Sequence, residues 1–242
     1  MLRKLSIGLL LGAAIVVSQM VFAPAASAAS LKVKVDSIKG GGAVPAKYAF
    51  CVPTPDGHMG AGPNISPAIS WSKGPRGTQS YAIVLFDTDS PKSDREKMNK
   101  EGMTVPTTAM RQAFYHWVLV DIPANVRSLK EGAGSNGRIA HGKPATADVG
   151  KPGVNMFTMV FANNDAMKGV YHNYDGPCPP WNDDNLHHYH FAVYALSVKS
   201  LGLTGDFDAP AALAAMKGKV LANGQFDATY TTTKALGAKV PK

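Results

Sequence analysis

Hydrophobic residues fall along this chain in short runs that are typical of β-strands. The clearest run is 80–86, SYAIVLF, where β-branched and aromatic residues follow one another without a polar break. Such an unbroken run predicts a strand that is buried on both faces. The segment 114–122, FYHWVLVDI, has the same character. Further strands or strand-like segments are expected at 31–35, 68–71, 155–162, 187–198 and 225–232.

One helix is predicted, close to the C-terminus. Asp208 can cap its first turn, Pro210 is tolerated in that turn, and the alanine-rich segment 211–220 favours helix. The charged stretch 92–101 is expected to be a short surface helix or a loop, and the remaining connections are rich in Gly, Pro and Asn. Many short strands with a few short peripheral helices predict a mainly β fold.

The N-terminal segment 1–28 has the features of a removable export signal. Two basic residues precede an apolar run at 5–22, and the tripeptide 26–28, ASA, fits the small-residue rule for cleavage. The alternative is a membrane anchor, because the run is nearly long enough to span a bilayer. We predict an exported protein, periplasmic or secreted, in which residues 29–242 form a single domain.

The chain is basic, with a formal net charge of +8 that falls to about +6 without Arg3 and Lys4. A basic surface suits contact with anionic lipid or cell-wall polymers, so membrane contact is expected to be peripheral at most. The basic residues are scattered and no Lys/Arg run is interleaved with aromatic residues, which argues against nucleic acid as a partner. An ordinary solvated basic surface is the simplest interpretation.

The two cysteines of the chain, Cys51 and Cys178, are far apart in the sequence. In an oxidising compartment they can pair, and a disulfide would then tie an early loop to a later one. Pairing requires closely spaced Cα atoms, which a sequence does not reveal. Both the paired and the free state therefore remain open.

The segment 174–194, YDGPCPPWNDDNLHHYHFAVY, is the part of the chain that points most directly to a function. Its prolines predict a rigid, non-helical loop. In the strand that follows, His187 and Tyr189 fall on one face, and His188 and His190 fall on the other. Two polar rings on one strand face can converge on a ligand, whereas a lone histidine in a strand is more often structural.

Acidic residues follow the strongest predicted strand, and a histidine lies near the start of the next strand along the chain. Asp87 and Asp89 are two residues apart, so they would share a face if the backbone is extended, and they would repel each other without a nearby cation. The alternative is a solvated turn in which Asp side chains bond to their own backbone. His116 lies near the start of the predicted strand 114–122.

Common catalytic patterns are absent from the sequence. Residues 134–137, GSNG, fall short of a nucleophile elbow because Ala133 stands at the first glycine position. No HExxH spacing and no phosphate-cradling glycine loop occurs. His187, His188 and His190 cannot all face one zinc ion, because their side chains alternate across the strand. We therefore predict no enzymatic activity, no metal and no cofactor, with an unrecognised hydrolase as the remaining alternative.

Five motifs follow one another along the chain: SPAISW at 66–71, DTDSP at 87–91, YHWVLVDIP at 115–123, GPCPP at 176–180 and LHHYHFAVYAL at 186–196. In this order they resemble the phosphatidylethanolamine-binding protein family, and in particular its bacterial branch, which is described as Raf-kinase-inhibitor-like. The late helix and closing strand match as well, so the resemblance covers nearly all of the chain after residue 28. Each motif is weak alone, but five in the right order are specific.

The resemblance implies a compact β fold of two packed sheets with a small pocket for phosphate, phosphorylated headgroups or acetate-like anions. By position, the ligand-binding residues would be Asp87, Asp89, Pro91, His116, Gly176, Pro179, Pro180, His187 and Tyr189. Imidazole and phenol groups can donate hydrogen bonds to an anion, and backbone N–H groups near Gly176 can add to them. Asp87 is expected to orient both imidazoles and to raise their pKa values, which would strengthen those hydrogen bonds.

The chain also departs from the family pattern. Thr88 replaces the proline between the two acids, and His188 stands where the family has arginine, so a permanent charge becomes a titratable one. The stretches before His116 and between residues 141 and 176 are longer than is usual. These insertions are expected to border the pocket and to change which ligands fit.

We therefore expect an exported protein that binds small anions or phospholipid headgroups through a His/Asp/Tyr pocket. The alternative is a secreted protein-interaction module, such as a protease inhibitor, that acts through the inserted loops. The partner would be a small phosphorylated ligand or headgroup in the first case and a protein in the second. The kinase-inhibitor name of the family is not transferred, because an exported protein would not meet such a kinase.

Overall fold

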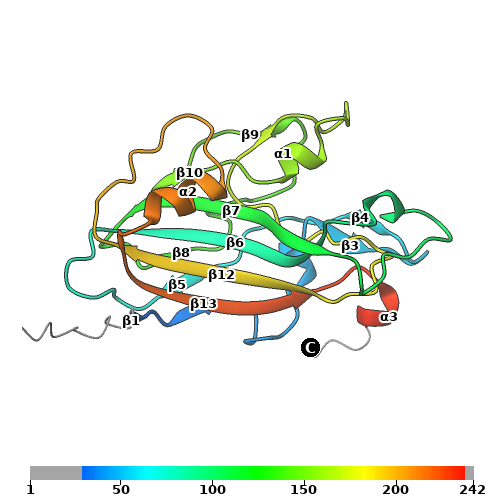
Figure 1. Ribbon diagram of the computed structural model, residues 1–242, viewed down its shortest axis with the longest axis horizontal. Helices are drawn as coiled ribbons and strands as arrows, with labels where there is room; N and C mark the ends of the chain where they lie inside the picture. The colour runs from blue at the N-terminus through cyan, green and yellow to red at the C-terminus, as the bar shows by residue number, and fades with distance from the viewer. Residues whose placement is uncertain (1–28, 238–242) are drawn as a thin grey trace, which may run out of the picture.

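The computed structural model describes residues 29–237, so the predicted export signal at 1–28 lies outside the described residues. A six-stranded sheet runs along the molecule (Figure 1). Its strands, in spatial order, are β1 (Ala29–Ser30), β13 (Val220–Tyr230), β12 (His187–Leu196), β6 (Ser80–Pro91), β7 (Arg111–Pro123) and β10 (Lys151–Pro152). β1 pairs with β13 in parallel, and the other neighbours are antiparallel.

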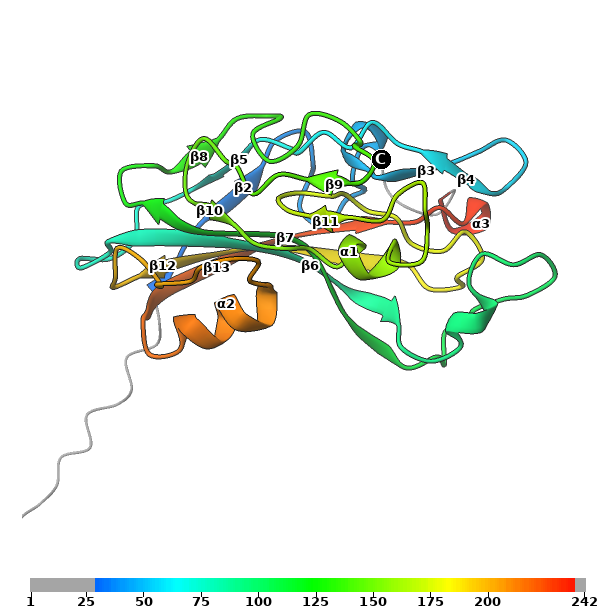
Figure 2. The same ribbon diagram turned by 90° about the horizontal axis from the view of Figure 1, so that it is seen from above.

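Smaller sheets cover one face of the large sheet, and helix α2 covers part of the other (Figure 2). A three-stranded sheet has the order β2 (Val33–Val35), β5 (Ile69–Trp71) and β8 (Ser128–Leu129). Two-stranded pairs are formed by β3 (Cys51–Pro53) with β4 (Met59–Ala61) and by β9 (Gly142–Lys143) with β11 (Val170–Tyr171). The helices are α1 (Phe157–Val160), α2 (Ala209–Met216) and α3 (Lys234–Gly237), with 3₁₀ turns at Ala46–Tyr48 and Arg95–Lys97. The prediction of a mainly β fold of packed sheets with few helices is confirmed.

The large sheet is buried on both faces at its centre, as the unbroken hydrophobic run of β6 predicts. Tyr81, Ile83 and Leu85 pack into the core between the sheets, whereas Ala82 and Val84 pack into a second core beneath α2. Alternation along the strand distributes the side chains between the two cores. Side chains therefore pack against the central strands on both faces of the sheet. This packing also fixes the strand ends that carry the side chains of the candidate site.

Helix α2 has the predicted start but ends earlier than predicted. The Asp208 carboxylate accepts a hydrogen bond from the Ala211 amide at 2.9 Å, which caps the first turn. The helix ends at Met216 rather than at residue 220, because Gly218 has a φ of +72° and the chain enters β13 at Val220. The predicted C-terminal part of this helix is therefore wrong.

The strand-like segment 155–162 is the clearest error in the predicted secondary structure, because it contains α1. Asn155 accepts a hydrogen bond from the Phe157 amide at 3.0 Å, which is typical of a residue that starts a helical turn. Phe157 is then buried against Phe50, with ring centroids 4.4 Å apart. Packing of the rings selects a helical turn where the sequence pattern alone favours a strand. No helix within residues 29–237 has the length and apolar character needed to cross a membrane.

Candidate functional site

A cavity of about 340 Å³ lies where β6, β7 and β12 meet the proline loop 176–180, the start of β3, and α1. Seven of the nine predicted ligand-binding residues line it: Asp87, Pro91, His116, Pro179, Pro180, His187 and Tyr189. The pairing of the strands explains this convergence, because Asp87 on β6 lies opposite Tyr189 on β12 and opposite Phe114 on β7. Asp89 and Gly176 do not line the cavity.

Asp87 and Asp89 do not share the face that the sequence predicts. Both lie within β6, but the pairing register with β7 shifts between Asp87 and Ser90, so the strand is irregular between the acids. Asp87 is buried beside the cavity. The Asp89 carboxylate instead accepts hydrogen bonds from the backbone N–H and Nδ1 of His188, each at 2.9 Å. The two acids therefore serve different parts of the structure.

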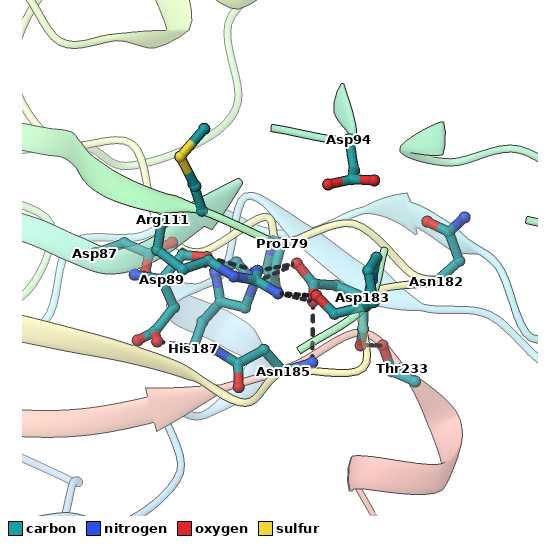
Figure 3. Close-up of polar contacts among 12 residues, drawn as sticks. Asp87, Asp89, Asp94, Arg111, Pro179, Asn182, Asp183, Asn185, His187 and Thr233 are labelled. Atoms are coloured by element: carbon teal, nitrogen blue, oxygen red, sulfur yellow. Dashed lines mark hydrogen bonds and ion pairs between the residues drawn. The ribbon is translucent and has the colours of Figure 1, made fainter. Parts of the chain in front are cut away.

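His187 is held between two carboxylates (Figure 3). Its Nδ1 donates to Asp87 Oδ2 at 2.7 Å, and its Nε2 donates to Asp183 Oδ2 at 3.2 Å. Burial opposes the charged imidazolium, but the two carboxylates outweigh burial and raise the pKa of His187 to about 9. Because both ring N–H groups are already in use, the predicted role of His187 as a donor to a bound anion is not supported by this geometry.

Asp183 connects His187 to a partly buried arginine and was missed by the sequence analysis. Arg111 donates to both Asp183 oxygens, at 2.6 and 3.0 Å, in a bidentate ion pair (Figure 3). Burial opposes ionisation of Asp183, but the hydrogen bonds from His187 and Arg111 lower its pKa. The four groups Arg111, Asp183, His187 and Asp87 form a chain of alternating charge, which we call the ionic chain. The only hint of this contact in the sequence was that Asp183 precedes His187 by four residues.

His116 differs from His187 in both its hydrogen bonds and its charge. Its Nδ1 donates to the backbone carbonyl of Asp175 at 2.8 Å, whereas Nε2 has no partner within the part of the chain that the structure describes. Burial lowers the pKa of His116 despite the nearby charge of Asp87. Asp87 acts in the predicted direction on His116, but burial outweighs it, so the prediction of a raised pKa holds for His187 and is wrong for His116. In its neutral form this ring offers the cavity an acceptor nitrogen rather than a donor.

Tyr189 has an unsatisfied hydroxyl. The side chain lines the cavity and is 1% exposed, and its buried oxygen finds no hydrogen-bond partner within residues 29–237. Burial raises the pKa of Tyr189 well above its usual value, so the phenol stays protonated and able to donate. The ring centroids of His116 and Tyr189 are 5.3 Å apart. We refer to these two residues as the open pair, because each carries a polar atom without a partner.

The proline loop is fastened to the start of β3. Cys51 and Cys178 form a disulfide with their Cα atoms 4.6 Å apart. Of the two states that the sequence left open for these cysteines, the structure has the paired one. The Pro177 carbonyl also accepts hydrogen bonds from the Phe50 and Cys51 amides, at 2.9 and 3.1 Å. These contacts hold the loop against β3, and both half-cystines line the cavity.

Gly176 has a packing role rather than the predicted ligand-binding role. A Cβ atom at this position would collide with the backbone oxygen of Tyr48, so only glycine fits. The Gly176 N–H donates to Asn64 Oδ1 at 2.8 Å and is not available to an anion. The Gly176 N–H itself is therefore not one of the backbone donors that were expected around this turn.

A buried polar network lies behind the cavity and was not predicted. The Asp175 carboxylate accepts hydrogen bonds from Asn64 at 2.7 Å, from Lys143 at 2.8 Å and from Asn155 at 2.8 Å. Burial lowers the pKa of Lys143, in opposition to its pairing with Asp175. Because the Asp175 carbonyl also binds His116, this network determines which nitrogen of His116 remains free.

The histidines on the opposite face of β12 make separate contacts outside the cavity. His188 is exposed and pairs with Asp89, while His190 Nδ1 lies 2.7 Å from Asp227. Within residues 29–237, no group of three or more His, Cys, Asp or Glu side chains is arranged to hold a metal ion.

Comparison with known proteins gives one consistent family. The sequence profile described as phosphatidylethanolamine-binding protein matches residues 34–231. The chain is 32% identical over 171 residues to a UPF0098 protein of Aquifex aeolicus, covering 70% of this chain and 75% of that protein. It is 30% identical over 176 residues to the UPF0098 protein YbcL of Escherichia coli, covering 73% and 74%.

Solved structures are similar as well. A Chlamydia trachomatis protein, described as a phosphatidylethanolamine-binding protein homologue, is 25% identical with a TM-score of 0.56, covering 83% of this chain and 97% of that one. The crystal structure of E. coli YbcL, described as a new member of the mammalian family, has a TM-score of 0.59 at 24% identity, covering 84% and 99%. At that identity the second match shows the shared fold alone.

Proposed function

The chain belongs to the phosphatidylethanolamine-binding protein family, and from this premise we propose that it binds small phosphate esters, such as phospholipid headgroups, or similar anions in the cavity. The observation that carries the proposal is the open pair. Tyr189 has a buried hydroxyl without a partner, and His116 Nε2 is unpartnered beside it among the described residues. A buried polar group without a hydrogen bond costs about 1–3 kcal/mol, and a ligand that supplies the bond recovers that free energy.

The open pair suits a ligand that brings a proton into the cavity. The neutral His116 Nε2 accepts a hydrogen bond from a protonated phosphate oxygen, or it takes up a proton and then donates to the anion. Tyr189 donates to a second oxygen. Either route leaves one more proton in the complex than in the separated partners at alkaline pH. Binding is therefore expected to weaken as the pH rises.

The ionic chain supports the site without contacting the ligand. Its two cations and two anions neutralise one another, and both N–H groups of His187 are already bonded. Asp87 keeps its place because its carboxylate also accepts the Asp89 N–H at 2.7 Å. In this proposal the ionic chain gives the cavity a rigid edge, and the protein binds its ligand without chemical turnover.

The proposed location is the periplasm or the exterior of the cell. The sequence at 1–28 has the pattern of an export signal, and the disulfide between Cys51 and Cys178 suits an oxidising compartment. At the membrane, contact would be peripheral, through the basic surface. Neither nucleic acid nor a metal enters the proposal.

Calorimetric titration tests the proposed binding. Phosphoethanolamine and inorganic phosphate are titrated into the purified protein at pH 6 and pH 8, beside His116→Ala and the matched control His188→Ala. His188 is an exposed histidine of the same sheet that lies outside the cavity. We expect binding that is tighter at pH 6, lost in His116→Ala and unchanged in His188→Ala. No heat from either compound at millimolar concentration would contradict the proposal.

A second candidate function is capture of a protein through the connection between β6 and β7. This connection, residues 92–110, presents Met103 and Met110 at 46% and 61% exposure, which is unusual for large apolar side chains. Inhibition of a panel of serine proteases tests it. Inhibition that is lost in the double variant Met103→Ser with Met110→Ser, and kept in His116→Ala, would favour this function over anion binding.

A further inference from the structure

The cavity is larger than a simple anion needs. Its volume is about 340 Å³, whereas one water molecule occupies about 30 Å³ in the liquid, so phosphate or acetate would fill only a small part. Cavities that enclose ring-sized organic ligands begin at about 300 Å³ and are mostly apolar, with a few polar groups that orient the ligand. The open pair supplies such polar groups, and the rest of the wall determines what else fits.

Four phenylalanine rings form a continuous aromatic wall on one side of the cavity: Phe50, Phe114, Phe157 and Phe161. Phe157 lies at the centre, with ring centroids 4.4 Å from Phe50, 5.4 Å from Phe114 and 5.7 Å from Phe161. Phe114 is also 4.8 Å from His116, so the wall reaches the open pair. These spacings are within the range in which aromatic rings attract one another, and another ring can join them.

Arg138 adds a positive charge to this wall. Its guanidinium lies 4.3 Å from the centroid of the Phe50 ring, a cation–π geometry, and Arg138 lines the cavity. Across residues 29–237 its side chain has neither an ion pair nor a hydrogen bond, although it is exposed to solvent. The other charged side chains that line the cavity, Asp87 and His187, belong to the ionic chain, in which the charges balance. An entering anion therefore meets the charge of Arg138 rather than that of His187.

From this arrangement we infer that the ligand is an anion that carries a flat aromatic group, with the ring packed against the aromatic wall and the acid between Arg138 and the open pair. This inference rests on the proposed function, because it concerns the same cavity. A phosphate monoester of an aromatic alcohol meets these requirements, with one protonated oxygen for His116 and one oxygen for Tyr189. A two-chain phospholipid is much larger than the cavity and would leave its chains outside.

Phenyl phosphate and methyl phosphate form the central test, because they have the same anionic group and differ in the ring. In calorimetry of the purified protein at pH 6, phenyl phosphate should bind about tenfold more tightly than methyl phosphate. This ratio corresponds to about 1.4 kcal/mol of binding free energy. Phe161 is only partly buried at the edge of the wall, so Phe161→Ala is the variant of choice. We expect it to remove the preference for the ring while methyl phosphate binds as before.

The arginine is tested separately. Arg138→Gln should weaken both compounds several-fold, and Arg138→Lys should retain part of the affinity through its charge. Arg76→Gln is the matched control, because Arg76 is an exposed arginine in the turn before β6, at the opposite end of that strand from Asp87. Thermal melting of every variant checks that it is folded. Unchanged binding of both compounds by Arg138→Gln would overturn the assignment of Arg138.

Other outcomes separate this inference from the proposed function. Methyl phosphate and phosphoethanolamine that bind as tightly as phenyl phosphate would overturn the aromatic ligand and leave anion binding intact. No binding of any phosphate compound would overturn both proposals. Binding of phosphatidylethanolamine vesicles without binding of phenyl phosphate would replace the aromatic anion with a lipid surface. A ring preference that survives Phe161→Ala would overturn the assignment of Phe161 as a contact of the aromatic ring.

Discussion

The two histidines of the cavity illustrate how neighbouring groups of the same type take different roles. His187 is charged and has carboxylates on both ring nitrogens, whereas burial keeps His116 neutral with one nitrogen free. The first belongs to the ionic chain and has both ring nitrogens bonded, and the second belongs to a site that is incomplete without a ligand. A polar cluster therefore divides into support and receptor according to which hydrogen bonds are already made.

Breaking the ionic chain should have the largest effect on stability. Asp183→Ala leaves the buried His187 and the partly buried Arg111 without their shared carboxylate. Removing one partner of a buried ion pair costs about 3–5 kcal/mol, and we expect a loss of that size in the free energy of unfolding measured with urea. The adjacent, exposed Asp184→Ala is the control and should change it by less than about 0.5 kcal/mol. Equal effects would show that Asp183 does not hold the ionic chain together.

His187 and His116 should have opposite effects on how the free energy of unfolding changes with pH. The pKa of His187 is raised to about 9 from an ordinary value of 6.5, so its contribution is complete below pH 6.5 and is lost as the pH rises through 9. This shift in the pKa of His187 contributes about 3 kcal/mol to the free energy of unfolding, at about 1.36 kcal/mol per unit of pKa shift. The pKa of His116 is lowered, so its contribution is present above pH 6.5 and is lost as the pH falls.

Urea unfolding measured from pH 5 to pH 9.5 checks these slopes. His187→Gln should flatten the profile above pH 6.5, and His116→Gln should flatten it below. If both variants flattened the profile on the same side of pH 6.5, the assignment of opposite pKa shifts to the two histidines would be wrong.

Ligand binding should be linked to a proton on His116. Above neutral pH the affinity for phosphoethanolamine should fall by up to about tenfold per pH unit, which corresponds to about 1.4 kcal/mol, because the neutral ring must gain a proton or accept one from the ligand. Titrations at pH 8 in two buffers with different ionisation enthalpies measure the number of protons taken up. One proton is expected for the wild-type protein and none for His116→Gln. Uptake that persists in His116→Gln would assign the proton to another group.

The smallest effect concerns the hydroxyl of Tyr189. Tyr189→Phe removes a buried oxygen without a partner, so stability should stay the same or rise by up to about 1 kcal/mol while affinity for the ligand falls. Tyr174→Phe is the matched control, because that hydroxyl donates to the Tyr48 carbonyl at 2.6 Å. Its loss should cost about 1 kcal/mol in thermal or urea unfolding. A destabilised Tyr189→Phe variant would mean that the Tyr189 hydroxyl already has a partner.

Much of the fold follows from local pattern. The buried run at 80–86 and the alternation after His187 predict β6 and β12, and the capping residue Asp208 predicts the start of α2. Each of these signals is contained within a short segment, so it can be recognised from the sequence alone. The seven predicted residues at the cavity depend on this pattern together with the family resemblance.

The remaining features depend on contacts between distant residues. Arg111 and Asp183 are 72 residues apart in the chain, and no local pattern pairs them. The register shift after Asp87 turns Asp89 toward His188, which strict alternation does not anticipate. The protonation of each histidine depends on partners supplied by other elements. Sequence therefore predicted which residues gather at the cavity but not which atoms remain free there.

The most direct test of this account is nitrogen NMR of the histidine rings, with His116 and His187 assigned by substitution, as phosphoethanolamine is added at pH 7.5. We predict that the His116 signals change from those of a neutral ring with a free nitrogen to those of a ring bonded at both nitrogens. The His187 signals should remain those of a protonated ring throughout. Signals of His187 that move while those of His116 stay constant would contradict the division between the ionic chain and the open pair.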